Sequence, residues 1–182
     1  MKKLIICFLF FITIEKSFAA EGDEWNFRFS PIAYLVGIIN GDLDYKVSEN
    51  IVIGPSLVLI NLKLDEKTYN VNSFGVQGSY YFESAFKDGF YLGGNFSTIS
   101  AEVSTLKYGP KITGSQDGTL VGLKCGYHWF WNSFNLNLGL TATSTAAMSN
   151  IKLIDNTGKT IDEVSPTKIS SRGVDFAIGF TF

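Results

Sequence analysis

Apolar residues recur at every second position along much of this chain, and this alternation constrains its fold more than any other feature. The carboxyl-terminal end shows it most clearly, because Val174, Phe176, Ile178, Phe180 and Phe182 alternate with small or polar residues. A period of two places successive side chains on opposite faces of a β-strand. Convincing helical periodicity is absent, and after residue 20 no apolar run approaches the length of a membrane-spanning helix. The sequence therefore predicts an all-β fold.

Eight strands follow from the alternation. Their approximate bounds are 25–36, 41–48, 51–62, 70–83, 89–103, 118–131, 133–147 and 173–182. Short connections at 48–50, 83–89 and 131–133 alternate with longer polar ones at 63–69, 104–117 and 148–171, and one more short connection lies near Asn40. Short turns at one end and long loops at the other are typical of outer-membrane barrels. The predicted fold class is an eight-stranded antiparallel transmembrane β-barrel with short periplasmic turns and longer extracellular loops.

The first and third predicted strands differ in their faces. In the first, one apolar face would carry Trp25, Phe27, Phe29, Ala33 and Leu35. The third strand is apolar on both faces, so its orientation stays open. It also contains Pro55, which has no N–H to donate to a neighbouring strand, and we expect a bulge or kink there.

Residues 1–19 are predicted to be a secretory signal peptide, which leaves residues 20–182 as one barrel domain. Lys2 and Lys3 precede an apolar run of 11 residues at 4–14, and small residues at 17 and 19 fit cleavage after Ala19. The alternative, a membrane anchor, is disfavoured because the run is too short to span a bilayer. Cleavage would leave one cysteine, Cys125, and therefore no internal disulfide. No basic patch indicates a nucleic-acid partner.

Aromatic residues provide a separate indication of a membrane barrel. They gather near the short turns, where a periplasmic girdle would lie at the membrane interface. The girdle is predicted to include Trp25, Phe27, Phe29, Tyr127, Trp129 and Trp131. The alternative is a soluble eight-stranded barrel of lipocalin type, with its apolar face turned inward. The polar faces of the later strands carry mostly Gly, Ser, Asn and Thr rather than Lys and Glu, which favours the membrane barrel.

The signal peptide, alternating strands, connection lengths and terminal FAIGFTF resemble the small eight-stranded outer-membrane β-barrel superfamily, which includes the transmembrane domain of outer membrane protein A. The resemblance covers the mature chain as an architecture, and its sharpest motif is the terminal Phe182. It implies that Phe176, Ile178, Phe180 and Phe182 form a signal for the barrel assembly machinery. The simpler alternative is that these side chains only face lipid.

Charged residues on the polar faces are the main candidate site. They are Arg28, Asp42, Asp44, Lys46, Lys124 and Asp175, and the single histidine, His128, is predicted to face the lumen with them. Burial of an unpaired charge is costly, so we expect a network of partners. Arg28 and Asp175 lie on the first and last strands, which are neighbours in a closed barrel, and we predict that they interact. The network would either fill the core or line a narrow ion path.

Catalytic and metal chemistry are not indicated. Some small barrels resemble lipid A hydrolases, which use a histidine and a nearby serine on one strand, but here Trp129 and Phe130 follow His128 and the expected serine is missing. One histidine and one mature cysteine cannot form a usual nitrogen and sulfur metal site, and no cofactor is expected. The acids at 64–67 and 161–164 are interpreted as solvated loop charges.

The longest connection, 148–171, is a candidate binding element. Its segment NIKLIDNTGKTIDEV could form a hairpin that extends the last two strands and binds a partner through its edge. We interpret the chain as a non-enzymatic, monomeric protein of the bacterial outer membrane, in contact with lipid and lipopolysaccharide. Its role would be envelope integrity or surface adhesion through the extracellular loops. A narrow pore is the alternative, and a lipid-modifying enzyme is third.

Overall fold

The computed structural model describes residues 24–65, 67–105, 112–155, 157, 159–166, 168 and 170–182. The predicted signal peptide lies outside these residues. The described elements are β1 (Trp25–Phe29), α2 (Pro31–Leu35), β2 (Ile38–Lys46), β3 (Ile51–Leu64), β4 (Lys67–Tyr81), β5 (Gly89–Thr105), β6 (Ile112–Trp131), β7 (Phe134–Met148), β8 (Ile151–Ile154), β9 (Thr160–Val164) and β10 (Ser170–Thr181). Among them, no helix is both long and apolar enough to span a membrane.

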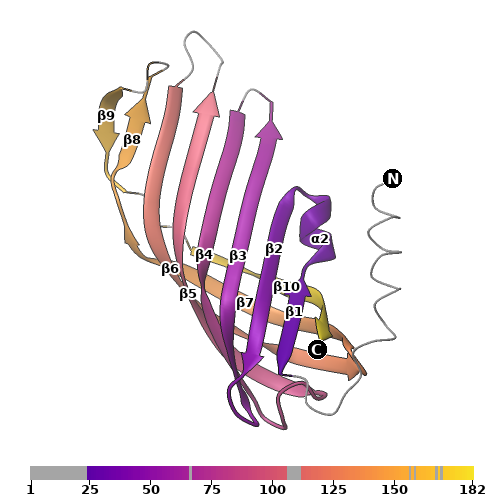
Figure 1. The fold of residues 1–182 in the computed structure, drawn as a ribbon. Coiled ribbons are helices and arrows are strands. Elements are labelled where there is room, and N and C mark those ends of the chain that lie inside the picture. Colours follow the sequence, from indigo (N-terminus) through magenta and orange to yellow (C-terminus); the bar gives the residue numbers. More distant parts are fainter. Residues whose placement is uncertain are drawn as a thin grey trace.

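Eight of the strands close into a ring (Figure 1). Neighbours along the chain pair from β1 to β7, β7 pairs with β10, and β10 returns to β1. Every pairing in the ring is antiparallel. The backbone of the two ends is also joined, since Trp25 and Phe182 each donate an N–H to the other's carbonyl. The predicted closed, eight-stranded antiparallel barrel is confirmed.

The faces of the ring strands follow the alternation in the sequence. Small and polar side chains point inward: Ser73, Gln77 and Ser79 of β4 are buried, and so are Asn135 and Asn137 of β7. Large apolar side chains point outward and are exposed. They include Ile53, Phe74, Val76, Phe90, Leu92, Phe96, Leu123, Leu138, Leu140 and Val174. The core of this barrel is therefore polar, and its surface is apolar.

The first predicted strand, 25–36, is wrong beyond Phe29. Ser30 caps a short helix, α2, by accepting a hydrogen bond from the Ala33 N–H at 3.3 Å, and Pro31 occupies the first turn. Serine at the N-cap followed by proline favours a helix start, because the serine oxygen satisfies a free N–H and proline needs no acceptor. Ala33 and Leu35 thus belong to this helix rather than to a strand face. Asn40, expected in a short connection, lies in β2.

The predicted long connections are shorter than expected because the strands continue through them. β3 and β4 pair as far as Leu64 and Lys67, which replaces the predicted 63–69 loop with a tight turn containing Asp65 at a φ of 53°. β5 and β6 likewise pair as far as Thr105 and Ile112, within the connection predicted at 104–117. Residues 106–111 of that connection lie outside the described residues. The connection 148–171 contains the β8–β9 hairpin, one of the alternatives that the sequence left open.

Of the bulge or kink expected at Pro55, the bulge is absent. The register of β3 stays constant against β4, with Pro55 opposite Val76, and it is the same on both sides of Pro55 against β2. The pairing of β3 with β2, in contrast, is interrupted at Gly54 and Pro55. At this point the two backbones lie so close that a Cβ on Gly54 would meet the Leu43 carbonyl oxygen at 1.7 Å. Glycine is required there because only glycine lacks this atom.

A small cluster closes the turn end of the ring. Val52, Tyr81, Ala85 and Tyr91 are buried together, and Phe86 packs against them. The connection that carries Ala85 is tied to the neighbouring turn by the Ala85 N–H, which donates to the Glu49 carbonyl at 2.6 Å. Phe86 has a φ of 65°, a left-handed conformation that is strained for a bulky residue. Packing against this cluster compensates for the strain.

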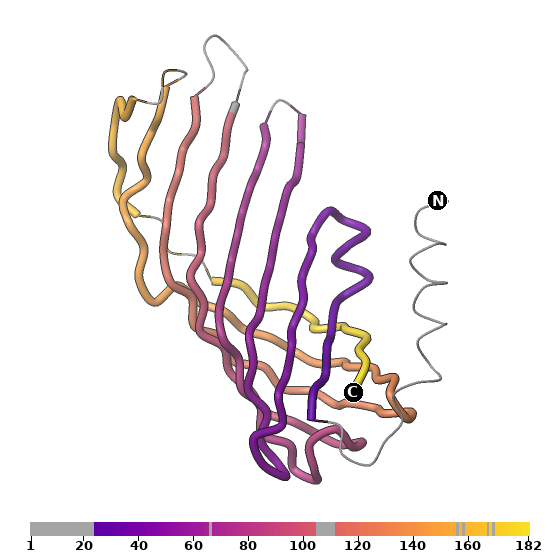
Figure 2. Tube along the Cα trace, viewed as in Figure 1, coloured from indigo at the N-terminus to yellow at the C-terminus, as the bar shows by residue number. Residues whose placement is uncertain are grey.

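At the other end, several strands project beyond the ring (Figures 1 and 2). β8 pairs with β6 at Thr113–Ser115, and β9 pairs with β8. We call this projecting sheet the extension. It consists of 58–64 of β3, 67–73 of β4, 99–105 of β5, 112–117 of β6, and the strands β8 and β9.

Candidate functional site

A charge cluster lies on the inner face of the ring, where β1 meets β2. The register places Arg28 opposite Asp42 and next to Asp44. The Arg28 Nε lies 2.9 Å from the Asp44 Oδ2, and its Nη2 lies 3.4 Å from the Asp42 Oδ2. Arg28 is 2% exposed and Asp44 is 1% exposed. The pairing compensates both buried charges, since either charge alone would be costly.

Two further side chains extend this cluster across the lumen. The Gln77 Nε2 of β4 donates to the Asp44 Oδ1 at 2.9 Å. The Lys124 Nζ of β6 in turn donates to the Gln77 Oε1. The chain of contacts thus reaches from β1 to β6 through Asp44 and Gln77, which fills the width of the lumen at this level.

The predicted interaction of Arg28 with Asp175 is electrostatic and longer-range, without a direct ion pair. Arg28 lies opposite Gly179 on β10, four residues away from Asp175, and it pairs with the aspartates of β2 instead. The Asp175 Oδ2 accepts hydrogen bonds from the Asn137 Nδ2 at 2.8 Å and from the Tyr91 hydroxyl at 3.4 Å. Lys46 stays outside the cluster, with no ion pair among the described residues.

His128 lies beside Tyr81 and Tyr91, and the three rings contact one another. Its ring stacks on Tyr91 at a centroid distance of 5.1 Å and on Tyr81 at 5.6 Å. The Tyr81 hydroxyl and the His128 Nδ1 are 2.8 Å apart and share a hydrogen bond. The Nε2 atom is buried and has no hydrogen-bond partner among the described residues. No serine takes part in these contacts, so the arrangement does not resemble a nucleophile with its base.

The neutral members of this interior were not singled out by sequence reasoning. Tyr81, Tyr91, Asn135 and Asn137 are as buried as Arg28, and each occupies an inward position of its strand. The Asn135 Nδ2 donates to the Asn26 Oδ1 at 2.8 Å, which links β7 to β1 across β10. The alternation already marked their face. Ranking inward residues by hydrogen-bonding capacity, rather than by charge, would have identified them.

The predicted girdle residues lie on the outer face. Trp25 contacts Tyr45 at a centroid distance of 4.7 Å, and Tyr127 contacts Trp129 at 4.8 Å. Trp131 is exposed at the end of β6. On β1, the rings of Phe27 and Phe29 stack on each other. The terminal residues Phe176, Ile178, Phe180 and Phe182 share this outer face, and Phe180 packs against Phe134 of β7 at 5.6 Å. Their proposed recognition during assembly stays a prediction.

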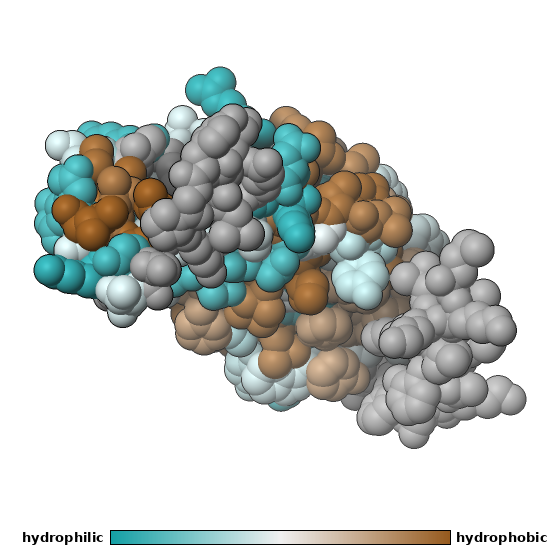
Figure 3. Space-filling view, turned by 90° about the horizontal axis from the view of Figure 1, so that it is seen from above, coloured by the Kyte–Doolittle hydropathy of each residue, from teal (hydrophilic) through white to brown (hydrophobic). Residues whose placement is uncertain are grey.

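The extension reverses the arrangement found in the ring. Its outer face carries mostly polar side chains, with apolar exceptions at Leu59 and Ile154. The polar ones are Asn61, Lys63, Thr68, Asn70, Asn72, Ser100, Glu102, Thr113, Ser115 and Asp117. Its inner face, which continues the lumen, carries mostly apolar ones: Val58, Ile60, Leu62, Val71, Ile99, Val103, Ile151 and Leu153. The change occurs between Leu59 and Asn61 on β3 and between Phe74 and Asn72 on β4. Figure 3, which looks onto the loop end, shows apolar side chains within a hydrophilic border there.

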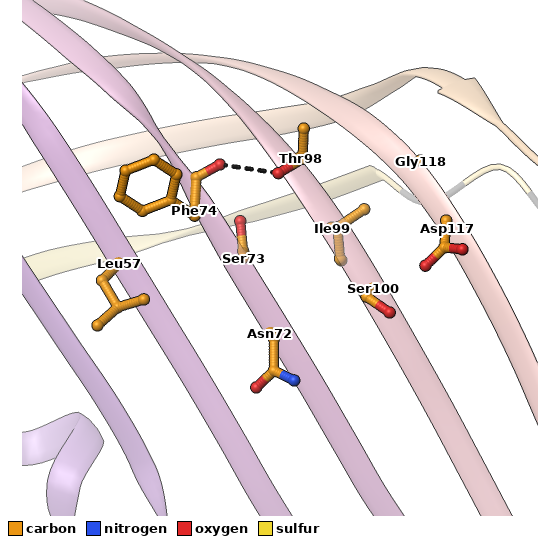
Figure 4. Close-up of a pocket in the computed structure, with 9 residues that line it drawn as sticks. All are labelled: Leu57, Asn72, Ser73, Phe74, Thr98, Ile99, Ser100, Asp117 and Gly118. Atoms are coloured by element: carbon orange, nitrogen blue, oxygen red, sulfur yellow. Dashed lines mark hydrogen bonds between the residues drawn. The ribbon is translucent and has the colours of Figure 1, made fainter.

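Two shallow grooves mark the same level on the outer face. One, of about 420 Å³, crosses β3 to β6 between Leu57, Phe74, Thr98 and Asp117 (Figure 4). The other, of about 450 Å³, lies nearer to β2 and includes Ile39, Asn61, Asn70 and Glu102. Asn72 lines both. Each groove therefore has apolar residues on the side of the ring and amide or acidic residues on the side of the extension.

Comparisons with known proteins give one match. No protein-family model matches the sequence, and no curated protein matches it. Among solved structures, the fold is similar to the N-terminal β-barrel domain of Pseudomonas aeruginosa OprF, with a TM-score of 0.49 and 9% sequence identity. The alignment covers 89% of this chain and 100% of that domain.

Proposed function

We propose that this chain is a non-enzymatic outer-membrane barrel that holds its extension outside the cell, where the extension binds a surface or a macromolecule. One observation carries the proposal: outward side chains are predominantly apolar on the ring and predominantly polar on the extension. In a bilayer, the outer face of a barrel contacts hydrocarbon, and its projecting parts contact water. The surface of this molecule is divided at the level where those two solvents would meet.

The dimensions of the apolar surface support a membrane position. On β4 and its flanking residue, outward apolar or aromatic side chains run from Phe74 to Phe82. Nine residues of strand rise about 27 Å, and a tilt of about 40° reduces this to about 21 Å. The apolar band of a membrane barrel is about 25 Å tall. The aromatic residues at the turn end would then lie at the periplasmic interface.

The interior supports a structural barrel rather than a pore. The cluster of Arg28, Asp44, Gln77 and Lys124 spans the lumen, and the aromatic layer at Tyr81 closes it below. A pore remains the second candidate because both layers are polar enough to rearrange around water. Planar-bilayer recordings separate the two: we expect no conductance, and steady channels that change in an Arg28→Ala variant would favour the pore.

The free edge of β9 is the proposed contact for a partner. Among the described strands, β9 pairs only with β8, and its residues Thr160–Val164 are all exposed. An unpaired edge offers N–H and C=O groups that can add another strand. Deletion of 152–166 should leave a folded barrel and abolish binding of any partner found. An Ile161→Pro variant is a gentler test, because Ile161 has no paired position on β8, so proline removes an N–H of β9 without replacing a paired residue.

Epitope insertion tests the orientation directly. An epitope at Thr157, in the β8–β9 turn, should be labelled by antibody on intact cells. The matched control carries the epitope between Asn132 and Ser133, in the β6–β7 turn, and should be labelled only after the outer membrane is opened. A heat-modifiability gel shift of outer-membrane fractions establishes that both variants form closed barrels. Labelling of the control on intact cells, or absence from the outer membrane, would overturn the proposal.

The terminal residue is proposed to act in assembly. We expect recognition of Phe182 by the barrel assembly machinery, in addition to its contact with lipid and lipopolysaccharide. Deleting Phe182 should lower the amount of folded protein in the outer membrane of cells, while the purified chain still refolds in vitro. Equal abundance in cells would show that the residue has only a packing role.

A further inference from the structure

The ring has an incomplete wall between β2 and β10. β1, which lies between them, pairs with β10 only from Asn26 to Phe29. From Ser170 to Ala177, β10 pairs with β7 on one side, and no described strand pairs with it on the other. The edge of β2 from Ile38 to Gly41 is likewise unpaired on the side of β1. We call this opening the wall gap.

The wall gap reaches the apolar part of the barrel surface. Val174 and Phe176 of β10, which border it, point outward with the apolar band, whereas Arg172 already belongs to the polar region. Unpaired strand edges in hydrocarbon are costly, because no water is available to bond their N–H and C=O groups. The helix α2 occupies this position, between β2 and β10 (Figure 1). A helix is suited to it, since its backbone groups bond within their own segment.

The helix is held at its ends rather than by its side chains. None of its five residues is buried, and Leu35 is 75% exposed. The Ser30 N–H donates to the Asn40 Oδ1 at 2.9 Å, and the Asn61 N–H donates to the Gly37 carbonyl at 3.4 Å. Few buried contacts and a short length are features of segments that open at low free-energy cost. The helix is thus a loosely packed cover for the wall gap.

Apolar surface continues from the helix to the inner face of the extension. A Cβ on Gly37, which follows α2, would lie 2.8 Å from the Leu62 Cδ2. From Leu62, inward side chains continue through Tyr69 and Val103 toward Leu153 of β8. Val103 is still 38% exposed in the folded chain, although the outer face beside it is polar. Exposed apolar area of this kind marks a binding surface.

We infer that the wall gap admits an acyl chain of a surrounding membrane lipid, which lies against the apolar inner face of the extension. The inference rests on the membrane position proposed above. An acyl chain is the occupant favoured by continuity, because the apolar outer band, the exposed residues of α2 and Leu62 form one surface. The polar outer face of the extension would then meet water while its inner face meets hydrocarbon. Burial of that face against alkyl groups is favourable in proportion to the area covered.

Quenching of tryptophan fluorescence by brominated lipid tests the inference. Trp25, Trp129 and Trp131 are first replaced by phenylalanine, and a single tryptophan is then introduced as Leu62→Trp or Asn61→Trp. These adjacent residues lie at the same height on opposite faces of β3. Each variant is placed in phosphatidylcholine vesicles whose acyl chains carry bromine. We expect loss of intensity for Leu62→Trp and little loss for Asn61→Trp.

A third variant, Leu123→Trp, separates this inference from the proposed function. It places the probe in the apolar band of the ring, and its intensity should fall in any barrel that spans the vesicle. No loss at this site would contradict the membrane position itself. Loss for Leu123→Trp without loss for Leu62→Trp would overturn only the acyl-chain site. A gel shift on heating confirms that each variant is folded.

A charged residue in α2 tests whether the acyl chain enters through the wall gap. In the Leu62→Trp background, Leu35→Glu places a carboxylate at the wall gap and should restore much of the lost intensity, because a charge disfavours passage of an alkyl chain. The matched control is Val36→Ala, which keeps the surface apolar and should leave the quenching unchanged. Unchanged quenching in the Leu35→Glu variant would show that lipid reaches Leu62 by another path and would overturn the role of the wall gap.

Discussion

The ring and the extension share four strands, yet the polarity of their two faces is inverted. The outward side chains are mainly apolar on the ring and mainly polar on the extension. Along β4, Phe74 and Val76 point outward from the ring, whereas Asn70 and Asn72 point outward from the extension. The backbone alternates without interruption between them, so strand geometry does not cause the difference. Residue choice does, and it follows the solvent expected on each side. The comparison shows that one strand can serve two environments if its pattern is inverted at the boundary.

The largest effect should come from the interior of the ring. Arg28→Ala would leave Asp42 and Asp44 without their guanidinium, and breaking a buried pair in this way costs about 3–5 kcal/mol. Urea unfolding of the refolded protein in lipid vesicles measures the loss. Lys46→Ala is the control, because Lys46 has no ion pair among the described residues, and it should change the free energy of unfolding by less than about 0.5 kcal/mol. Equal losses would contradict the assignment of the cluster.

A charge placed on the outer face should distinguish the two regions. On β6, Leu123→Lys puts an ammonium in the apolar band and should lower the free energy of unfolding by about 2–4 kcal/mol. Thr113→Lys makes a similar change on the outer face of the extension, where the cost should be about 0–1 kcal/mol. The same vesicle unfolding assay applies to both. If the two variants lost equal stability, the solvent boundary between ring and extension would be misplaced.

The smallest effect compares neighbouring tyrosines. Tyr81→Phe removes the hydroxyl that bonds to the His128 Nδ1, and the expected cost is about 1 kcal/mol. Tyr80→Phe removes a hydroxyl from the exposed outer face, and its cost should be close to zero. Unfolding of both variants under identical conditions gives the difference. A larger loss for Tyr80→Phe would contradict the inward and outward faces assigned to β4.

Sequence reasoning predicted the ring well because each residue there has only two choices, inward or outward. The faces of Phe74, Gln77, Leu123 and Lys124 follow from the period of two alone. The helix α2 was missed because apolar residues at Ala33 and Leu35 continued the alternation by chance. Ser30 followed by Pro31 contained the contrary signal, and at this position the local capping preference decided the structure.

The partners within the lumen could not be predicted to the same degree. Strand order places β1 beside both β2 and β10, which correctly makes Asp42, Asp44 and Asp175 candidates for Arg28. The choice among them depends on register, and a shift of a few residues along β10 moves Asp175 out of reach. The hairpin β8–β9 was likewise foreseen as an alternative. Its attachment to β6 required knowledge of how far β6 projects.

The shortness of β1 has a consequence for the order of assembly. This strand pairs at four positions with β2 and at four with β10, and it carries Arg28 between them. Until it is in place, β2 and β10 are both edges, and the two aspartates of β2 lack their counter-ion. Pairing of β1 with β2 alone brings Arg28 to both aspartates, whereas pairing of β1 with β10 closes the ring. The lumen charge is therefore neutralised by a hairpin of neighbouring strands, and only the second edge of the same strand has to wait for the last strand of the chain.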